Sequence, residues 1–168
     1  MLQKNFFSNK SKGDVLLELK NHNIKFKIPK TIVFNIKDWK KNKKKIYKNV
    51  RKLLQKKIAI RSSSINEDLR NYSGAGKYLS FLNVKTYNEN NFYKLVNKII
   101  RTYIKKNKIS DQIIVQNMVT KVKSSGVVFT KDLENGANYY VINYDDVTGK
   151  TNTVTSGKGH YSNRILYI

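Results

Sequence analysis

The sequence predicts an α+β fold with a mixed β-sheet. Segments with helical periodicity alternate with short apolar strand patterns early in the chain, and strand patterns dominate its end. The chain has 168 residues, of which 39% are hydrophobic and 11% are aromatic. A chain of this length and composition can bury a core, so intrinsic disorder is not expected.

The first part of the chain predicts a helix, a strand, a helix and a strand in turn. Residues 12–22 carry apolar side chains at helical spacing, and residues 32–36 form a strand pattern. Residues 38–56 combine an apolar stripe with a lysine-rich face, as a surface helix does. Residues 58–60 predict a short buried strand that runs directly into Arg61-Ser62-Ser63. The apolar stripe consists of Trp39, Ile46, Val50, Leu53 and Leu54.

The middle of the chain predicts a loop, a strand and a helix. Residues 64–76 are expected to form the loop. Leu79, Phe81 and Val84 alternate with other residues as the buried positions of a strand do. Residues 89–106 have the clearest helical pattern in the chain.

The end of the chain is β-rich. Apolar runs at residues 113–115, 126–129 and 139–142 predict three strands. Asn135-Gly136 is expected to form a tight turn between the last two, because both residue types tolerate a positive φ.

The net charge of +23 allows two interpretations. Clustered Lys and Arg can bind nucleic acid or an anionic membrane by releasing counterions. The lysines here are spread along the chain, with one dense run at residues 40–45, and this distribution favours ordinary solvated side chains. We therefore expect neither a membrane nor a nucleic-acid partner.

Composition also limits the cellular setting and the kinds of site. The chain has no cysteine, which excludes a disulfide framework and cysteine-rich zinc sites. Residues 1–10 contain no apolar stretch of signal-peptide length, and no later run approaches the ~20 apolar residues of a membrane span. We expect a cytoplasmic protein.

The chemistry is expected around the end of the strand at residues 58–60. Arg61 follows this strand, and a guanidinium can hold phosphate through two parallel hydrogen bonds. Gly74-Ala75-Gly76 would let backbone N–H groups approach an anion closely. A glycine-containing loop alone is also typical of an ordinary turn.

The segment Ile60–Val84 resembles the nucleotide-binding domain shared by phosphoenolpyruvate synthase, pyruvate phosphate dikinase and rifampin phosphotransferase. Residues 113–119 are similar to the family's hinge strand, and residues 125–136 to its Ser-Gly-Val-Xaa-Phe-Thr segment, with Leu133 where proline is usual. Residues 11–34 are similar to its opening block. The matching residues in the first segment are Arg61-Ser62-Ser63, Glu67-Asp68, Gly76 and Leu82-Asn83.

This resemblance implies an ATP-grasp-like domain with two subdomains. Residues 1–110 would form the first subdomain with its phosphate loop, and residues 111–168 the beginning of the second. Lys12 and Arg61 match the family's catalytic cations on the nucleotide phosphates. Without the motifs around it, Lys12 would be one solvated lysine among many.

The remaining binding residues follow from the same resemblance. Gly76, Lys77 and Ser80 fall on the phosphate loop, while Gln116 and Met118 fall on the adenine side. Gln116 could equally be a strand residue satisfied by backbone groups, and Met118 could fill the core.

The resemblance also implies the reaction and what is missing. ATP would give AMP and phosphate, with a phosphoryl group passed to a small-molecule acceptor through a histidine in another domain. The Mg²⁺ ligands and this domain have no match here, so we expect a catalytically incomplete part of a longer enzyme. Residues 25–39 and 139–159 resemble a branch of synthase-like kinases from surface-polysaccharide clusters, which includes the L-glutamine kinase that begins capsular phosphoramidate synthesis.

Several residues remain outside this scheme. Asp145-Asp146 could bind a metal, but adjacent acids after a strand are typical of a turn. His22 and His160 have no partner at ligand spacing. Two other functions stay open: a basic module that stacks nucleic-acid bases on its 11 tyrosines and 7 phenylalanines, and an inactive remnant or partner subunit.

Overall fold

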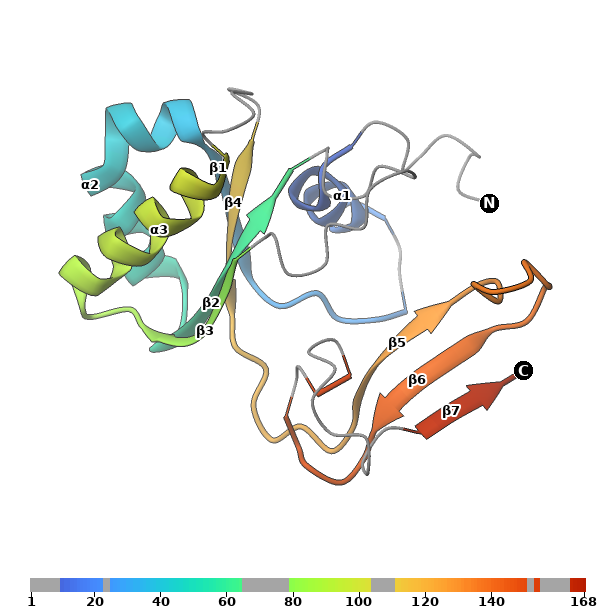
Figure 1. Cartoon of the computed structure of the whole chain (residues 1–168). Helices are drawn as coiled ribbons and strands as arrows, with labels where there is room; N and C mark the ends of the chain where they lie inside the picture. Colours follow the sequence, from blue (N-terminus) through green and yellow to red (C-terminus); the bar gives the residue numbers. More distant parts are fainter. Residues whose placement is uncertain (1–9, 23–24, 65–78, 104–110, 151–152, 155–163) are drawn as a thin grey trace. The chain divides into compact units, whose positions relative to one another are not determined.

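The computed structural model describes residues 10–22, 25–64, 79–103, 111–150, 153–154 and 164–168. They belong to two compact units, Met1–Met118 and Val119–Ile168 (Figure 1). The segment at residues 112–117 belongs to the first unit, because it is hydrogen-bonded into the sheet of that unit.

The first unit contains three helices and four strands among its described residues. In chain order they are α1 (Lys12–Leu19), β1 (Thr31–Asn35), α2 (Ile36–Leu53), β2 (Lys57–Ser63), β3 (Ser80–Lys85), α3 (Glu89–Tyr103) and β4 (Gln112–Asn117). The four strands form one sheet in the order β1-β4-β2-β3. The elements agree with the expected succession, although α1 is shorter than predicted and Ile36 begins a helix instead of ending a strand.

The expected mixed sheet is wrong for the described strands, since each pairing is antiparallel. Two strands that are joined by a helical crossover pair in parallel when they occupy adjacent positions in the sheet. Here β4 lies between β1 and β2, and β2 lies between β3 and β4. Each helical crossover therefore skips one position, and an antiparallel strand fills the gap.

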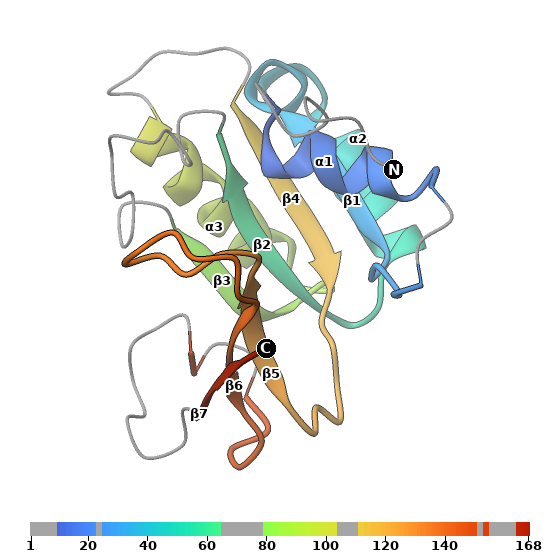
Figure 2. The ribbon, with the colours of Figure 1, turned by 90° about the vertical axis from the view of Figure 1, so that its right-hand side faces the viewer.

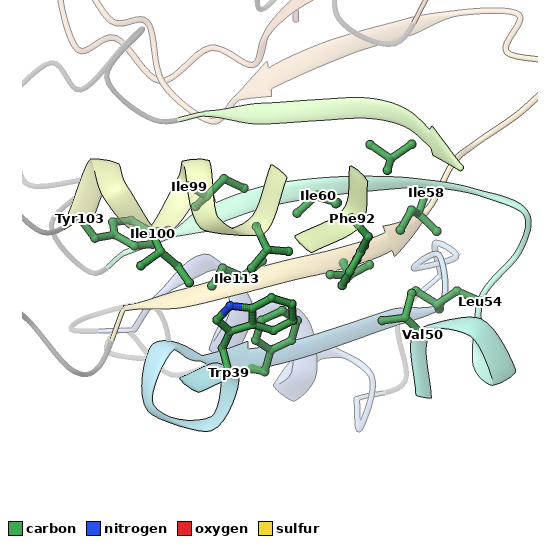
Figure 3. Close-up of a cluster of buried hydrophobic side chains, with 14 residues drawn as sticks. Trp39, Val50, Leu54, Ile58, Ile60, Phe92, Ile99, Ile100, Tyr103 and Ile113 are labelled. Carbon is green, nitrogen blue, oxygen red and sulfur yellow. The ribbon is translucent and has the colours of Figure 1, made fainter. Parts of the chain in front are cut away.

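Helices α2 and α3 cover one face of this sheet, and α1 lies against the other (Figures 1 and 2). The core lies under α2 and α3, because alternate residues of each strand point to that face. Trp39 and Phe92 occupy its centre, surrounded by isoleucines and valines of the strands (Figure 3). The predicted stripe of α2 is mostly buried, but Leu53 is 43% exposed, whereas Leu54, 9% exposed, enters the core.

The second unit contains a three-stranded antiparallel sheet in the order β5-β6-β7, formed by β5 (Ser125–Phe129), β6 (Val141–Asp145) and β7 (Arg164–Tyr167). The third predicted strand starts too early, since Tyr139 and Tyr140 precede β6. Tyr140 nonetheless exchanges two backbone hydrogen bonds with Ile168, beyond β7. β7 was not predicted.

The turn at Asn135-Gly136 is present, but it does not form a two-residue hairpin. Gly136 has a φ of 72°, and its N–H donates to the carbonyl of Asp132 over 3.0 Å. The Asp132 carboxylate also accepts from the N–H groups of Glu134 and Asn135. These contacts close a turn within the longer connection between β5 and β6.

In the part of the chain that is described, no helix is long and apolar enough to cross a membrane.

Candidate functional site

Arg61 and Ser80 are cross-strand partners on the sheet face opposite α2 and α3. Arg61 pairs with Ser80 of β3 on one side and with Ile114 of β4 on the other. Directly paired residues point to the same face, with Cβ atoms about 5 Å apart. Both Arg61 and Ser80 are exposed. The structure thus brings together two of the residues that the sequence predicts for a phosphate site.

Helix α1 joins Lys12 to the strand that carries Arg61. The backbone N–H of Gly13 donates a 2.8 Å hydrogen bond to Ser63 Oγ, which is buried at the end of β2. Ser63 lies two residues beyond Arg61 and therefore on the same face of the sheet. Lys12 is the first residue of α1 and precedes Gly13 directly. The backbone of Lys12 is therefore held close to the end of β2, and its side chain is exposed.

Gly13 permits this close approach because it has no side chain. A Cβ atom at this position would lie 2.4 Å from Gln112 Oε1 and 2.8 Å from Val33 Cγ1. Both distances are far below van der Waals contact, so any other residue here would force Gln112, Val33 or α1 itself to shift.

Gln112 of β4 holds the first turn of α1 from a second side. Its Nε2 donates to Asp14 Oδ1 over 2.7 Å, and its Oε1 lies 2.7 Å from Ser11 Oγ. Ser11 caps the helix, accepting from the N–H of Asp14, while the Asp14 carboxylate accepts from the N–H of Ser11. The Ser11 hydroxyl has a single proton, which it can donate to Gln112 or to Asp14 but not to both at once.

The charge of Asp14 is stabilised by this arrangement. Partial burial by itself raises the pKa of a carboxyl group, but hydrogen bonds from Gln112 and Ser11 outweigh it, together with the positive charge of Lys10. The net result is a pKa of Asp14 below its ordinary value.

Tyr103 links the two strand residues that hold α1. Its hydroxyl donates to the carbonyl of Gln112 over 2.9 Å, and it accepts from the N–H of Ser63 over 2.6 Å. Its side chain is 3% exposed, at the end of α3. The sequence pattern indicated an apolar helix position here and missed this polar role. The Ser11–Asp14 capping box, in contrast, can be recognised from its spacing.

Gln116 lies further along the same face of β4. It pairs with Thr31 of β1 and Ala59 of β2, and its Nε2 donates to Thr31 Oγ1 over 3.0 Å. The observed partner of its amide is therefore a side chain, where the alternative interpretation expected a backbone group. Met118 follows β4, is half-buried, and donates its N–H to the carbonyl of Lys57 over 3.2 Å.

Some predicted residues lie outside the described part of the chain. Gly76 and Lys77 of the phosphate loop are among them, as is His160. His22 is described and exposed.

Asp145 organises a turn in the second unit, as the sequence favoured. Its carboxylate accepts from the N–H groups of Val147 and Thr148, each over 2.9 Å, and from the Thr148 hydroxyl. The hydroxyl and N–H of Thr148 hold the pKa of Asp145 well below its ordinary value. Asp146 forms an ion pair with Arg164 at 3.0 Å.

The described residues do not fit a Mg²⁺ site. No group of three His, Cys, Asp or Glu side chains gathers among them, and the Asp145 carboxylate is already engaged by its turn. We assign no catalytic step to a metal ion.

Five aromatic residues of the first unit pack against one another. The ring of Trp39 stacks on Phe34 with centroids 5.5 Å apart and makes T-shaped contacts with Phe92 and Tyr93. Tyr47 joins the same cluster. These five rings are not available to stack nucleic-acid bases. Other described aromatic side chains are exposed, namely Phe26, Tyr87, Tyr139, Tyr140 and Tyr167. The lysines at residues 40–45 are exposed on α2.

A family model described as "Pyruvate phosphate dikinase, AMP/ATP-binding domain" matches residues 14–158. A search of curated proteins found no match. The matched range contains Arg61, Ser80, Gln116 and Met118, and it begins two residues after Lys12.

Proposed function

The chain belongs to the pyruvate phosphate dikinase AMP/ATP-binding domain family, and from this premise we propose that its first unit binds the phosphates of ATP on the sheet face carrying Arg61. The observation that carries the proposal is the pairing of Arg61 with Ser80 on an exposed face, beside the Gly13–Ser63 contact that anchors α1. A guanidinium, a hydroxyl and a lysine-bearing helix turn then lie around one region of the sheet.

Arg61 contributes the main phosphate contact in this proposal. Its planar guanidinium can donate two parallel hydrogen bonds to phosphate oxygens, a geometry that lysine does not offer. No ion pair is recorded for Arg61 within the described residues, where the ion pairs are Lys10–Glu18 and Arg164–Asp146. An exposed arginine that forms no ion pair with these residues is well suited to an anionic ligand.

Lys12 and Ser80 provide secondary contacts to the nucleotide phosphates. Lys12 supplies a positive charge at the start of α1, where the helix dipole also favours an anion. Ser80 can donate its hydroxyl proton to a phosphate oxygen from the strand next to Arg61. Gly76 and Lys77 are proposed for the same phosphates on the basis of the family motif alone.

Gln116 and Met118 contribute to the adenine side. Gln116 lies on the same sheet face as Arg61, with its amide oriented by Thr31. Met118 follows directly on the strand, and its thioether can pack against a flat aromatic base. Both assignments depend on the family resemblance and on this placement along β4.

Family membership supports a role in an ATP-dependent phosphotransferase. We propose that ATP is converted to AMP and phosphate, with a phosphoryl group passed through a histidine of another domain to a small-molecule acceptor. L-glutamine, for capsule modification, is the acceptor suggested by the resemblance of residues 25–39 and 139–159 to the L-glutamine kinase branch. Phosphoryl transfer in such an enzyme depends on positioning and charge stabilisation, and the described residues supply the positioning of the nucleotide phosphates.

A thermal-shift titration tests the proposal. The full chain should show a saturable rise in Tm with Mg-ATP, and Arg61→Ala should remove most of that rise. The matched titration uses single-stranded DNA at equal charge concentration and two salt levels. A Tm response to DNA alone, collapsing at the higher salt, would overturn ATP binding in favour of a polyanion-binding surface formed by the α2 lysines.

A further inference from the structure

We infer that Ser63 and Gln112 are positioning residues, which fix the first turn of α1 so that Lys12 reaches the same triphosphate as Arg61. The inference rests on the proposed function and deepens it, because neither residue belongs to the proposed phosphate or adenine contacts. Ser63 and Gln112 are direct partners on adjacent strands β2 and β4. Together they contact three residues at the start of the helix: Ser11, Gly13 and Asp14.

Ser63 accepts a hydrogen bond from the first turn of α1, a function that a capping residue next to the helix usually has. The first N–H groups of any helix lack an intrahelical acceptor. In α1 the local cap Ser11 accepts from the N–H of Asp14, while the N–H of Gly13 is satisfied by Ser63, 50 residues away. The Ser11 cap would serve an isolated helix equally well. The Ser63 contact adds a fixed attachment of this turn to the strand of Arg61.

Gln112 removes the remaining freedom of the turn. A single hydrogen bond to Gly13 would still allow α1 to rotate about that contact. Gln112 binds Asp14 through its Nε2 and accepts from Ser11 through its Oε1, so it contacts residues on both sides of Gly13. Rotation or translation of α1 would break the contacts to both strands at once.

Tyr103 makes the two attachments act as one unit. Because its hydroxyl contacts the backbone of both Ser63 and Gln112, the strand ends cannot separate without breaking a buried hydrogen bond. Lys12 therefore starts from a backbone fixed relative to Arg61. A lysine on a fixed backbone loses less entropy when it binds a phosphate than a lysine on a mobile helix.

A double-mutant cycle on the full chain tests this inference. Isothermal titration calorimetry with ATP and with adenosine compares the wild type, Ser63→Ala, Lys12→Ala and the double variant. We expect Ser63→Ala to weaken ATP binding about tenfold, in line with the loss of one buried hydrogen bond, and to leave adenosine binding unchanged. In the Lys12→Ala background, Ser63→Ala should change ATP affinity less than about twofold, because the effect acts through Lys12.

A second variant and a control keep the test decisive if Ser63→Ala folds poorly. Gln112→Met keeps the side-chain length but removes the hydrogen bonds to Ser11 and Asp14, and it should show the same coupling to Lys12. Thr86→Val removes a buried hydroxyl elsewhere in the unit and should leave ATP affinity unchanged. Amide exchange of Gly13 should become faster in Ser63→Ala and remain slow in Thr86→Val.

The possible failures can be told apart. A wild-type chain that does not bind ATP overturns the proposed function and the inference that depends on it. If the wild type binds ATP but Ser63→Ala weakens ATP and adenosine equally, or acts equally in the Lys12→Ala background, the positioning role is wrong and the proposed function stands. An unchanged ATP affinity in Lys12→Ala also overturns the inference.

Discussion

The backbone N–H of Gly13 and the hydroxyl of Ser63 form a 2.8 Å hydrogen bond across 50 residues of sequence. This contact places the residue after Lys12 against the residue two positions beyond Arg61. Neither cation lies near the other in the sequence. The sheet face and this one bond bring their backbones into the same region.

The shape of the guanidinium matters at position 61 as well as its charge. Arg61→Ala should weaken ATP binding by about 10- to 100-fold, the range expected for charge-assisted hydrogen bonds. Arg61→Lys should recover only part of the loss, since an ammonium group cannot donate two parallel bonds. Calorimetry with ATP measures both, and Arg51→Ala on exposed α2 is the control. Full recovery by lysine would show that Arg61 acts as a simple charge.

Gly13→Ala should destabilise the first unit. Alanine within a helix usually stabilises by about 0.5–1 kcal/mol relative to glycine. Here its Cβ would overlap Gln112 and Val33, and overpacking typically costs about 1–3 kcal/mol. Urea unfolding of the variant should give a lower midpoint, whereas Asn49→Ala on the exposed face of α2 should not. A more stable Gly13→Ala variant would mean that α1 does not approach the sheet this closely.

Asp14 should make stability depend on pH in the acidic range. Its folded-state pKa lies below the unfolded value of about 4, so its contribution is present above that pH and is lost as the pH falls through the folded-state pKa. The difference in unfolding free energy between wild type and Asp14→Asn should therefore be constant near neutral pH and shrink on acidification. Urea unfolding at several pH values measures it, and a difference that grows on acidification would contradict the assignment.

The Thr148 hydroxyl should control the ionisation of Asp145. Thr148→Val removes the largest cause of the lowered pKa, so the pKa of Asp145 should rise toward its ordinary value. A side-chain carboxyl titration by NMR measures this shift. Thr130→Val, an exposed change in the same unit, should leave the titration unaltered. An unchanged pKa in Thr148→Val would show that the backbone N–H groups alone determine it.

The lysines of α2 should not contribute to ATP binding. Lys43 and Lys44 are exposed on a helix that covers the sheet face opposite Arg61 (Figure 1). Lys43→Ala combined with Lys44→Ala should change ATP affinity less than about twofold, while it weakens any binding of single-stranded DNA. Calorimetry with each ligand separates the two effects. A large loss of ATP affinity would indicate that the phosphates bind on the α2 side of the sheet, which would contradict a site on the face of Arg61.

The sequence predicted most of the elements because their patterns are local. The stripe of α3 and the strand at Ile58–Ile60 each depend on neighbours a few positions away. Sheet order could not be predicted in this way, since it depends on which strands meet after two helical crossovers. The antiparallel pairings were therefore missed.

The same limit applies to the candidate site. Arg61 was recognised from its place at the end of a strand and from the family motif, and the pairing with Ser80 follows the strand register. The roles of Gln112 and Tyr103 could not be predicted, because their partners lie far away in the sequence. A glutamine before an apolar run and a tyrosine in a helical stripe carry no local sign of such contacts.

The position of β4 has a consequence for the order in which the unit can fold. β1 is hydrogen-bonded to β4 and to no other described strand, so Thr31 has no strand partner until Gln116 is available. Contacts of such large sequence separation form slowly. On the ribosome, α1, β1 and β2 would emerge well before the strand that joins them. Lys12 and Arg61 would then remain unassembled until nearly the whole first unit has been synthesised.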